Sequence, residues 1–367
     1  VTVLVVVGAG SKYEREEENG VSHFLEHMFF KGTRKRPNAL SVSETLDKVG
    51  GMYNAFTGKE YTGYFAKVAS KHFDLALDWV SDIFLNSKIE AKEMEKERGV
   101  IAEELNMCLD TPIKYINDIW EQLLYGNQPA GWEIIGKREN ILNLQRKNLF
   151  DYFKNHYSAQ NTIICVSGNF NPSAIRAKIQ RHFQPINKNN PKPKLAVKES
   201  QQQPGALFHF KKTDQTHLCL GVRGYDLSHP KRYAQELLAI ILGGNMSSRL
   251  FAEIREKRGL AYYVHSESES YTDSGYLATQ AGVPHQKVAQ VISLILKEYK
   301  AVRDKNVSFA ELKKAKDYLK GILTLSLESS DAQASFYAGQ ELLAGKILTL
   351  QEKCVKIDKI NLKDISE

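Results

Sequence analysis

The pattern of apolar and polar positions divides the first part of the chain into strands and amphipathic helices. An unbroken apolar run at residues 1–8 predicts a buried strand. Two runs rich in β-branched and aromatic residues, 52–57 and 61–68, predict a pair of strands. Apolar residues at spacings of three and four predict the helices between and after these strands. The predicted helices lie at residues 19–30, 41–49, 71–85 and 91–109.

The same order of elements returns in the second part of the chain, which indicates an internal repeat. Each copy reads strand, two helices, two strands and two long helices, and each is followed by a further helix. Those further helices end in similar sequences, Leu-Leu-Tyr-Gly in the first copy and Leu-Leu-Ala-Gly in the second. In the second copy the strands are predicted at residues 217–222, 262–267 and 275–283, and the helices at 231–242, 248–257, 286–302 and 308–326.

A segment rich in Pro, Asn, Lys and Gln, residues 188–205, separates the two copies and predicts a linker. We therefore expect the α+β fold class, with two homologous domains at residues 1–187 and 206–367. Each domain is expected to be an antiparallel-rich sheet covered by helices. Two such domains facing each other would leave a cleft, which is a common place for a functional site.

Composition excludes some classes of function. The 367 residues are 42% hydrophobic, which is typical of a chain that buries a core. The net charge of +7 is spread along the sequence, so we expect no nucleic-acid partner. No apolar run reaches the length of a membrane span, so none is expected. The first strand is entered midway, which favours a native chain that begins further upstream. No cysteine lies in a C-x-x-C pair, and buried, structural free thiols are expected at Cys108, Cys165, Cys219 and Cys354.

Candidate chemistry is concentrated on the helix predicted at residues 19–30. His23 and His27 are four residues apart, so both imidazoles project from one face of that helix. Two neutral imidazoles on one face can bind a single divalent ion. Glu26 lies on the neighbouring flank, close enough to act on a water molecule without being a ligand itself. This order is the His-x-x-Glu-His pattern of the inverzincins.

A catalytic zinc ion needs a third protein ligand and an open position. The acidic helix predicted at residues 91–109 is the best source of that ligand. Glu97 and Glu104 lie two turns apart on one face of this helix, whereas Glu103 is rotated by about 100° from Glu104. We therefore expect Glu104 to be the third ligand and Glu97 to accept a hydrogen bond from a ligand histidine. The buried face of the helix predicted at residues 91–109 is expected to contain Val100, Ile101 and Leu105.

Three motifs together resemble the pitrilysin-type (M16) metallopeptidases, above all the group that contains mitochondrial processing peptidase beta subunits and their bacterial relatives. The motifs are His23-Phe-Leu-Glu-His-Met-Phe-Phe-Lys-Gly-Thr33, Asn54-Ala-Phe-Thr57 and Glu97-Arg-Gly-Val-Ile-Ala-Glu-Glu104. The resemblance covers nearly the whole chain, including the repeat. It implies a single zinc ion per chain, with Glu26 as the general base and Glu97 as the second glutamate near the site. The zinc ligands that it implies are His23, His27 and Glu104.

The resemblance also implies where a peptide substrate binds. Asn54 and Ala55, with Phe56 beside them, match an edge strand on which the substrate adds as an extra strand. In the second copy, Arg255 and Tyr262 match a pair that in relatives reaches the substrate carbonyl and the developing oxyanion. The second copy has no His-x-x-Glu-His pattern, so only the first copy would hold zinc.

The sequence therefore predicts a zinc-dependent endopeptidase that hydrolyses peptides or unfolded, presequence-like segments bound as an added strand. One alternative is an inactive or partner-dependent subunit of a heterodimeric M16 peptidase, although the ligand positions are intact. Another is a nucleotide-binding protein, prompted by Gly8-Ala-Gly10, but Tyr13 stands where the fingerprint needs a glycine. The expected partners are a peptide substrate and a second subunit, either a copy of this chain or a related one. The expected location is a bacterial-type cytoplasm, with a compartment like the mitochondrial matrix as the alternative.

Overall fold

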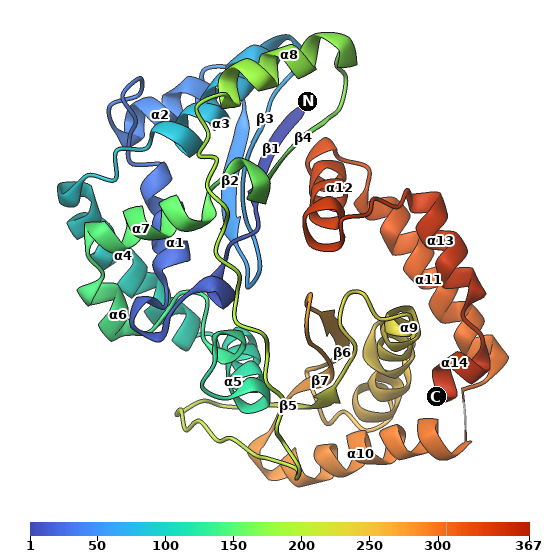
Figure 1. The fold of residues 1–367 in the computed structure, drawn as a ribbon. Coiled ribbons are helices and arrows are strands. Elements are labelled where there is room, and N and C mark those ends of the chain that lie inside the picture. The colour runs from blue at the N-terminus through green and yellow to red at the C-terminus, as the bar shows by residue number, and fades with distance from the viewer. Residues whose placement is uncertain (306) are drawn as a thin grey trace. The chain divides into compact units, whose positions relative to one another are not determined.

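The computed structural model describes residues 1–305 and 307–367 and divides them between two compact units, neither of which is contiguous in sequence. Figure 1 shows the helices and strands of both. Unit 1 consists of Val1–Leu109, Gly126–Ala196 and Leu327–Ile347. Unit 2 consists of Asp110–Tyr125, Val197–Ser326 and Leu348–Glu367.

The helices and strands of each unit follow the predicted alternation closely. Unit 1 contains β1 (Thr2–Val7), α1 (Val21–Phe29), α2 (Ala39–Asp47), β2 (Met52–Thr57), β3 (Thr62–Lys67), α3 (Phe73–Asn86), α4 (Ala91–Leu109), α6 (Arg138–Asn143), α7 (Arg146–His156), β4 (Thr162–Ser167), α8 (Pro172–Phe183) and α12 (Ser330–Ala344). Unit 2 contains α5 (Pro112–Tyr125), β5 (Thr216–Arg223), α9 (Arg232–Gly243), β6 (Tyr263–Ser270), β7 (Gly275–Val283), α10 (Val288–Lys305), α11 (Phe309–Ser326), α13 (Leu350–Lys359) and α14 (Leu362–Ser366).

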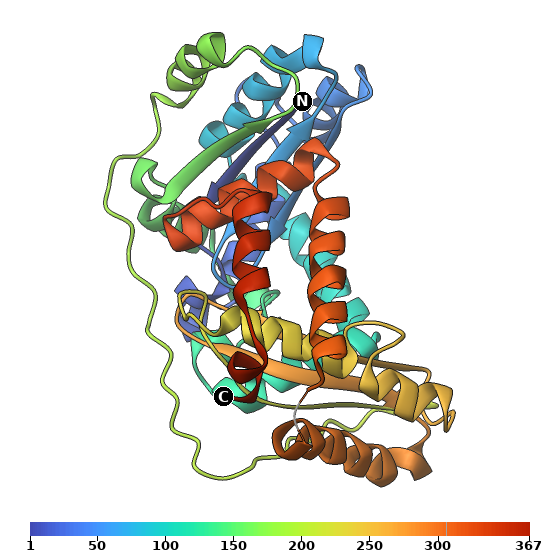
Figure 2. The same ribbon diagram turned by 90° about the vertical axis from the view of Figure 1, so that its right-hand side faces the viewer.

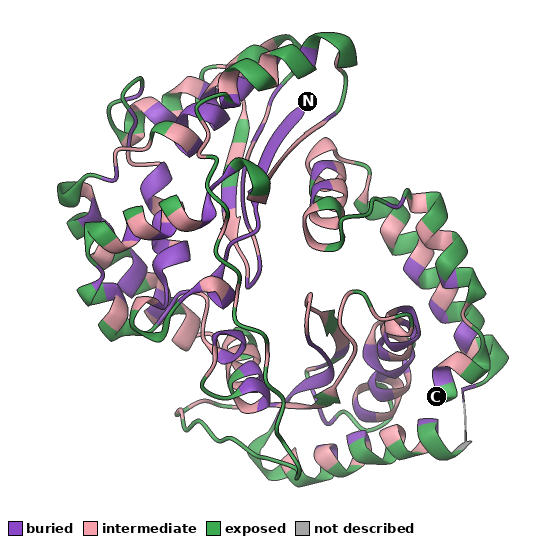
Figure 3. Ribbon diagram, viewed as in Figure 1, coloured by how far each residue is buried: buried purple, intermediate pink, exposed green. Residues whose placement is uncertain are grey.

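The sheet of unit 1 has four antiparallel strands in the order β2-β3-β1-β4. Strand β1 is central and buried along its whole length, as Figure 3 shows. Val3 and Val5 face the main core, where α3 packs against β1. Leu4 and Val6 point to the other side, where they pack against α12. Because both faces of the strand are covered, its sequence is continuously apolar rather than alternating.

The sheet of unit 2 has three antiparallel strands in the order β5-β7-β6, and its central strand β7 is buried throughout. The apolar face of α9 closes one side of this core, with Leu237 fully buried. One predicted helix differs in kind: Phe251–Glu256 is a π-helix, in which the Lys257 N–H donates to the Ala252 carbonyl five residues back. A segment this short holds too few apolar residues to separate a period of 3.6 from the wider π spacing.

The two sheets confirm the predicted α+β class and repeat, since the order β2-β3-β1 in unit 1 corresponds to β6-β7-β5 in unit 2. The units depart from the contiguous division at residues 187 and 206 in one respect. The corresponding helices α5 and α12 are exchanged, so that each belongs to the unit formed mainly by the other half of the sequence. Figures 1 and 2 show α12 lying along β1 and β4. Hydrophobic periodicity indicates which face of a helix is apolar, but it does not indicate against which sheet that face packs. The exchange of α5 and α12 could therefore not be predicted from the sequence.

The segment 188–205 contains no helix or strand, as predicted for a linker, and the boundary between the units falls within it, after Ala196. The sequence patterns did not predict β4, α7 or α8, which complete unit 1. All four cysteines are free thiols, but each is partly exposed and not buried as a structural thiol was expected to be. Among the described residues, none of the helices combines the length and apolar character that crossing a membrane requires.

Candidate metal centre

Helix α1 separates an apolar stripe from a polar one. Phe24, Leu25 and Met28 are fully buried in the core of unit 1, which anchors the helix. His23 and His27 lie on the other stripe, with their ring centroids 4.6 Å apart. The helix is thus fixed by its apolar face, and the two imidazoles are presented together on its remaining face.

The structure brings both histidines to Glu104 of α4. One ligand atom from each of the three residues lies within 4.8 Å of the others. The Glu104 Oε2 atom is 3.7 Å from His23 Nε2 and 3.4 Å from His27 Nε2. The histidine side chains are only 12% and 19% exposed, whereas that of Glu104 is 42% exposed. The three donors therefore converge on one point that is covered on the histidine side and accessible on the glutamate side.

Helix α4 packs against α1 through a stripe that differs in one position from the predicted one. Ile101 and Leu105 are buried as expected, but Val100 is 52% exposed. The stripe runs instead through Met94 and the carboxylate residue Glu97, which is 4% exposed. A glutamate can replace an aliphatic residue there because its charge is compensated by hydrogen bonds inside the site.

Glu97 connects His27 to a lysine. Its Oε1 atom lies 2.8 Å from His27 Nδ1 and its Oε2 atom lies 2.6 Å from Lys31 Nζ. Burial alone would raise the pKa of Glu97, but the hydrogen bonds from His27 and Lys31 outweigh it and hold the pKa below its usual value. An ionised Glu97 that accepts from Nδ1 leaves Nε2 of His27 as the nitrogen that faces Glu104.

The two histidines have opposite electrostatic environments. Burial, helped by the charge of His27, lowers the pKa of His23 to about 4. Burial also disfavours the charged form of His27, but hydrogen bonds to Glu104 and Glu97 outweigh it and raise the pKa to about 9. The hydrogen bond with His27 in turn holds the pKa of Glu104 below its usual value. A divalent ion would displace the proton in the hydrogen bond between His27 Nε2 and Glu104, because the ion needs the same lone pair on Nε2.

Glu26 lies beside this cluster and is held from a different element. The hydroxyl of Thr57, the last residue of β2, donates a hydrogen bond to Glu26 Oε2. Burial raises the pKa of the Glu26 carboxyl, and the hydrogen bond from Thr57 partly opposes that rise. A carboxylate with a raised pKa is a better proton acceptor than a free one, which is what a general base requires.

This donor set fits a zinc ion. Two imidazole nitrogens and one carboxylate oxygen, with a further direction left accessible, form a set that catalytic zinc sites use. The hydrogen bond between His27 and Glu97 supplies the carboxylate that commonly orients a ligand histidine. The chemistry of the residues therefore suits a zinc ion at the point where His23, His27 and Glu104 converge.

Strand β2 is an edge strand, as expected for the segment that contains Asn54 and Ala55. It stands at one end of the sheet of unit 1 and pairs with β3. Asn54 is exposed, and its Oδ1 atom accepts a hydrogen bond of 2.9 Å from the Ala55 N–H. The Phe56 side chain packs with the apolar cluster beneath α12, so only its main chain is suited to bind a peptide.

Arg255 and Tyr262 lie next to each other in unit 2. The Arg255 guanidinium is 4.9 Å from the centroid of the Phe251 ring and 5.7 Å from that of the Tyr262 ring. Tyr262 is 75% exposed and follows Gly259, whose φ of +58° ends the preceding helix. The pair predicted from the sequence is thus a half-buried arginine beside an exposed tyrosine, and its role toward a substrate stays a prediction.

Two residues at the site were not predicted from the sequence. Thr57 is the last residue of the motif Asn54-Ala-Phe-Thr57, and Lys31 lies within the motif that begins at His23, but the sequence assigned neither of them a role. Lys31 lies just beyond the C-terminal end of α1, so only its closeness in sequence to His27 pointed to this position. No local signal relates Thr57 to Glu26, because their contact depends on how β2 lies against α1.

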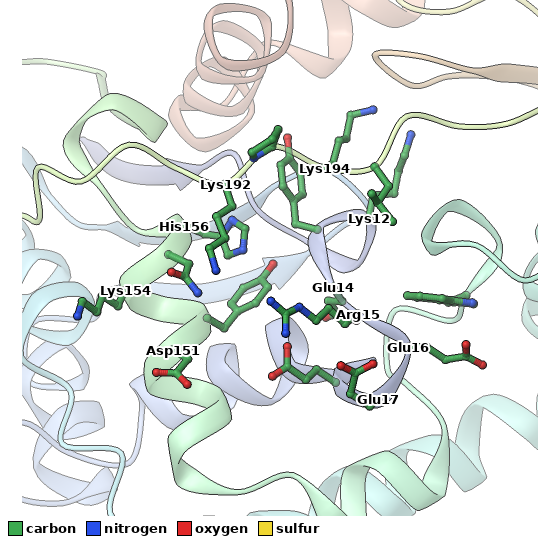
Figure 4. Close-up of a pocket in the computed structure, with 17 residues that line it drawn as sticks. Lys12, Glu14, Arg15, Glu16, Glu17, Asp151, Lys154, His156, Lys192 and Lys194 are labelled. Carbon is green, nitrogen blue, oxygen red and sulfur yellow. The ribbon is translucent and has the colours of Figure 1, made fainter.

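Unit 1 also contains a cavity of about 640 Å³ whose lining residues include none of the metal-site residues. Figure 4 shows basic side chains such as Lys192 and acidic ones such as Glu17 around it. His156 lies in its wall, where burial and the charge of Lys192 lower the pKa of the imidazole to about 4. Glu14, which precedes α1, also lines this cavity.

Comparison with known proteins accounts for both halves of the chain. Residues 1–138 match the family model described as insulinase (peptidase family M16), and residues 143–319 match that of the peptidase M16 inactive domain. A relative from Bacillus subtilis strain 168, named "Uncharacterized zinc protease YmxG", is 37% identical over 366 residues, which are 100% of this chain and 88% of the relative. The chain belongs to the M16 peptidase family. An "Uncharacterized zinc protease" from Rickettsia felis is 34% identical over 366 residues, again 100% of this chain and 88% of the relative.

Solved structures agree with this assignment to the M16 family. A protease from Helicobacter pylori superposes with a TM-score of 0.93 at 25% identity, over 100% of this chain and 89% of the other. A peptidase M16 inactive domain from Pseudomonas fluorescens superposes with a TM-score of 0.90 at 18% identity, over 100% and 87%. The second likeness, at this low identity, concerns the fold alone. The chain is thus an M16 protein similar to proteins named zinc proteases.

Proposed function

We propose that this M16 protein is a zinc-dependent endopeptidase that cuts peptides or unfolded, presequence-like segments. The observation that carries the proposal is the convergence of His23, His27 and Glu104 within 4.8 Å, with Glu26 beside them. These three residues would hold one zinc ion. When bound, the ion supplies a Lewis acid that acidifies water and polarises the scissile carbonyl.

Glu26 is the residue that moves the proton in this mechanism. The Thr57 hydroxyl holds its Oε2 atom, which leaves Oε1 to accept a proton from the attacking water. Glu26 then donates the proton to the nitrogen of the leaving amine, so the carboxylate is restored at the end of the cycle. The raised pKa of Glu26 suits both directions of this transfer.

Substrate binding is assigned to the edge of β2. A peptide added as a strand beside β2 would pair with the main chain of residues 54–56, and the Ala55 N–H would exchange the Asn54 side chain for a substrate carbonyl. Recognition through the main chain selects extended segments rather than particular side chains. Arg255 and Tyr262 are proposed to contact the substrate carbonyl and the developing oxyanion, as the family resemblance implies.

The test is the variant Glu26→Gln, with Glu103→Gln as the matched control because Glu103 is an exposed glutamate of α4. We expect Glu26→Gln to retain about one zinc ion per chain and to lose about 1,000-fold or more in cleavage of a quenched peptide library, as for the removal of a general base with its water. Glu103→Gln should keep both. Cleavage by Glu26→Gln at the wild-type rate would exclude Glu26 as the base.

A second candidate is a subunit that is active only with a partner. It is supported by the match of residues 143–319 to a model described as an inactive domain. If the wild-type chain binds zinc but cleaves no peptide until a related chain is added, the protein is a partner-dependent subunit. The proposal of a peptidase that is active by itself would then be rejected. The bacterial origin of the relatives supports a bacterial-type cytoplasm as the proposed location. The proposed assembly, as the family resemblance implies, is a homodimer or a heterodimer with a related subunit.

A further inference from the structure

The metal-bearing helix α1 begins without a cap of its own. Gly20 occupies the N-cap position, has φ of +100° and offers no side chain to the free N–H groups of the first turn. A larger residue is excluded there, because a Cβ atom would come within 2.6 Å of the Ile135 carbonyl oxygen. An ordinary capping residue such as Ser or Asp is therefore not compatible with this position, and another group must satisfy the helix.

Glu14 is that group. Its side chain reaches the start of α1 from the preceding loop, and Glu14 is only 3% exposed. The Oε2 atom accepts from the Gly20 N–H at 2.8 Å and from the Asn19 side chain at 2.9 Å. The Oε1 atom accepts from the Ser22 N–H at 2.9 Å and from the Ser22 hydroxyl. Burial raises the pKa of Glu14 to about 7, against the hydrogen bonds from Ser22, Gly20 and Asn19, and in its ionised form the carboxylate places a negative charge at the positive end of the helix.

The two ligand histidines are not supported in the same way. The ring of His27 is oriented by Glu97 through its Nδ1 atom. In the part of the chain that the structure describes, the buried Nδ1 atom of His23 has no hydrogen-bond partner. The direction of the His23 ring is therefore set by its backbone, which lies in the first turn of α1 and directly follows Ser22.

We propose that Glu14 is a positioning residue for the metal centre: by capping α1 through Gly20 and Ser22, it holds the His23 imidazole in register with His27 and Glu104. Glu14 does for His23 through the main chain what Glu97 does for His27 through the ring. The inference rests on the proposed metal site, and it assigns a function to a residue outside all three metal-site motifs.

Glutamine cannot replace Glu14 in this arrangement. Both backbone groups and the Asn19 amide that contact the carboxylate donate hydrogen bonds, so both of its oxygens must accept. Glutamine has one accepting oxygen, and its NH₂ group would face either the Gly20 N–H or the Ser22 N–H. One of these two backbone N–H groups is then left without an acceptor in a buried place, which loosens the start of the helix that carries His23.

The experiment compares zinc binding by the full-length wild type, Glu14→Gln and a control variant, Asp82→Asn. Asp82 is also a buried carboxylate of unit 1, but it accepts from Thr33 and Arg36 rather than from α1. Zinc affinity is measured by competition with a chromophoric chelator at a temperature where circular dichroism shows each variant to be folded. The absorption spectrum of the cobalt-loaded protein reports the coordination geometry.

We expect Glu14→Gln to bind zinc about 10- to 100-fold more weakly than wild type and to change the cobalt spectrum, whereas Asp82→Asn changes neither. Should Glu14→Gln fail to fold, Ser22→Ala removes only the hydroxyl bond and is expected to weaken zinc binding by about threefold.

Unchanged zinc affinity and cobalt spectrum in the folded variant would overturn the role of Glu14 while leaving the proposed peptidase intact. An equal loss in Asp82→Asn would also overturn it, since the effect would then be a general loss of stability. A wild-type chain that binds no zinc would overturn the metal site itself, and this inference with it.

Discussion

At the scale of single residues, the proposed metal centre includes carboxylates that are not proposed as ligands. Glu97 is nearly inaccessible to solvent, yet it is held as an anion by His27 on one oxygen and Lys31 on the other. Such a buried ion pair costs desolvation free energy and is retained where it orients a group. Here the oriented group is the imidazole of His27, whose other nitrogen faces Glu104.

The variant Glu97→Gln tests this orientation. Glutamine keeps the size of the side chain but leaves Lys31 without its negative partner and weakens the hydrogen bond to His27. We expect the dissociation constant for zinc to rise about 10- to 100-fold, with the fold retained. Competition with a chelator measures it, and Glu103→Gln serves as the control on the same helix. An unchanged constant would mean that the rigidity of α1 alone positions His27.

At the scale of elements, α12 is a necessary layer of unit 1 although it lies near the end of the sequence. Ala334 and Ala338 are fully buried against Leu4 and Val6 of β1. Small residues allow the helix to approach the sheet closely, and the second face of β1 would be exposed to water without it. The apolar strand and the small-residue face of the helix are therefore complementary parts of one core.

A charge on that face should destabilise unit 1 specifically. Ala338→Asp would bury a carboxylate without a partner and is expected to cost about 3 kcal/mol or more in the free energy of unfolding. Ser335→Asp, at an exposed position of the same helix, should cost little. Hydrogen exchange should show faster opening of β1 and β4 in Ala338→Asp. Faster exchange confined to β5 and β7 would instead assign the helix to unit 2.

At the scale of the whole molecule, a duplicated sequence has diverged into two different chemical parts. Unit 1 carries the histidines and glutamates of the proposed metal centre, whereas α9, the counterpart of α1, contains no histidine and only one glutamate, Glu236. The family model described as an inactive domain matches residues 143–319, a part of the sequence without the His-x-x-Glu-His pattern. Zinc should therefore stabilise one unit of the protein and not the other.

Thermal unfolding with and without zinc tests this division. At a zinc concentration 100-fold above the dissociation constant, binding adds about 2.7 kcal/mol to the stability of unit 1. For a unit of this size the expected rise in its Tm is about 5–10 °C, and a chelator should reverse it. His23→Ala should abolish the rise. A zinc-dependent shift that persists in His23→Ala would mean that zinc binds elsewhere.

Much of the fold was predictable because its signals are local. The boundaries predicted for α4 and for β7 match the structure, since hydrophobic periodicity within a segment follows from which of its faces is buried. The identity of the second-half π-helix and the exposure of Val100 were not predictable, because both depend on small rotations that short patterns do not resolve.

The sequence by itself determined that His23 and His27 share one face of α1, with Glu26 on the neighbouring flank, because helical geometry converts their spacing into proximity. It also indicated Glu104 and Glu97 as partners. Only the tertiary structure decided that Thr57 holds Glu26, that Glu14 caps α1, and that α12 covers β1. These contacts join segments far apart in sequence, and they depend on which surfaces meet when the core closes, which no local pattern records.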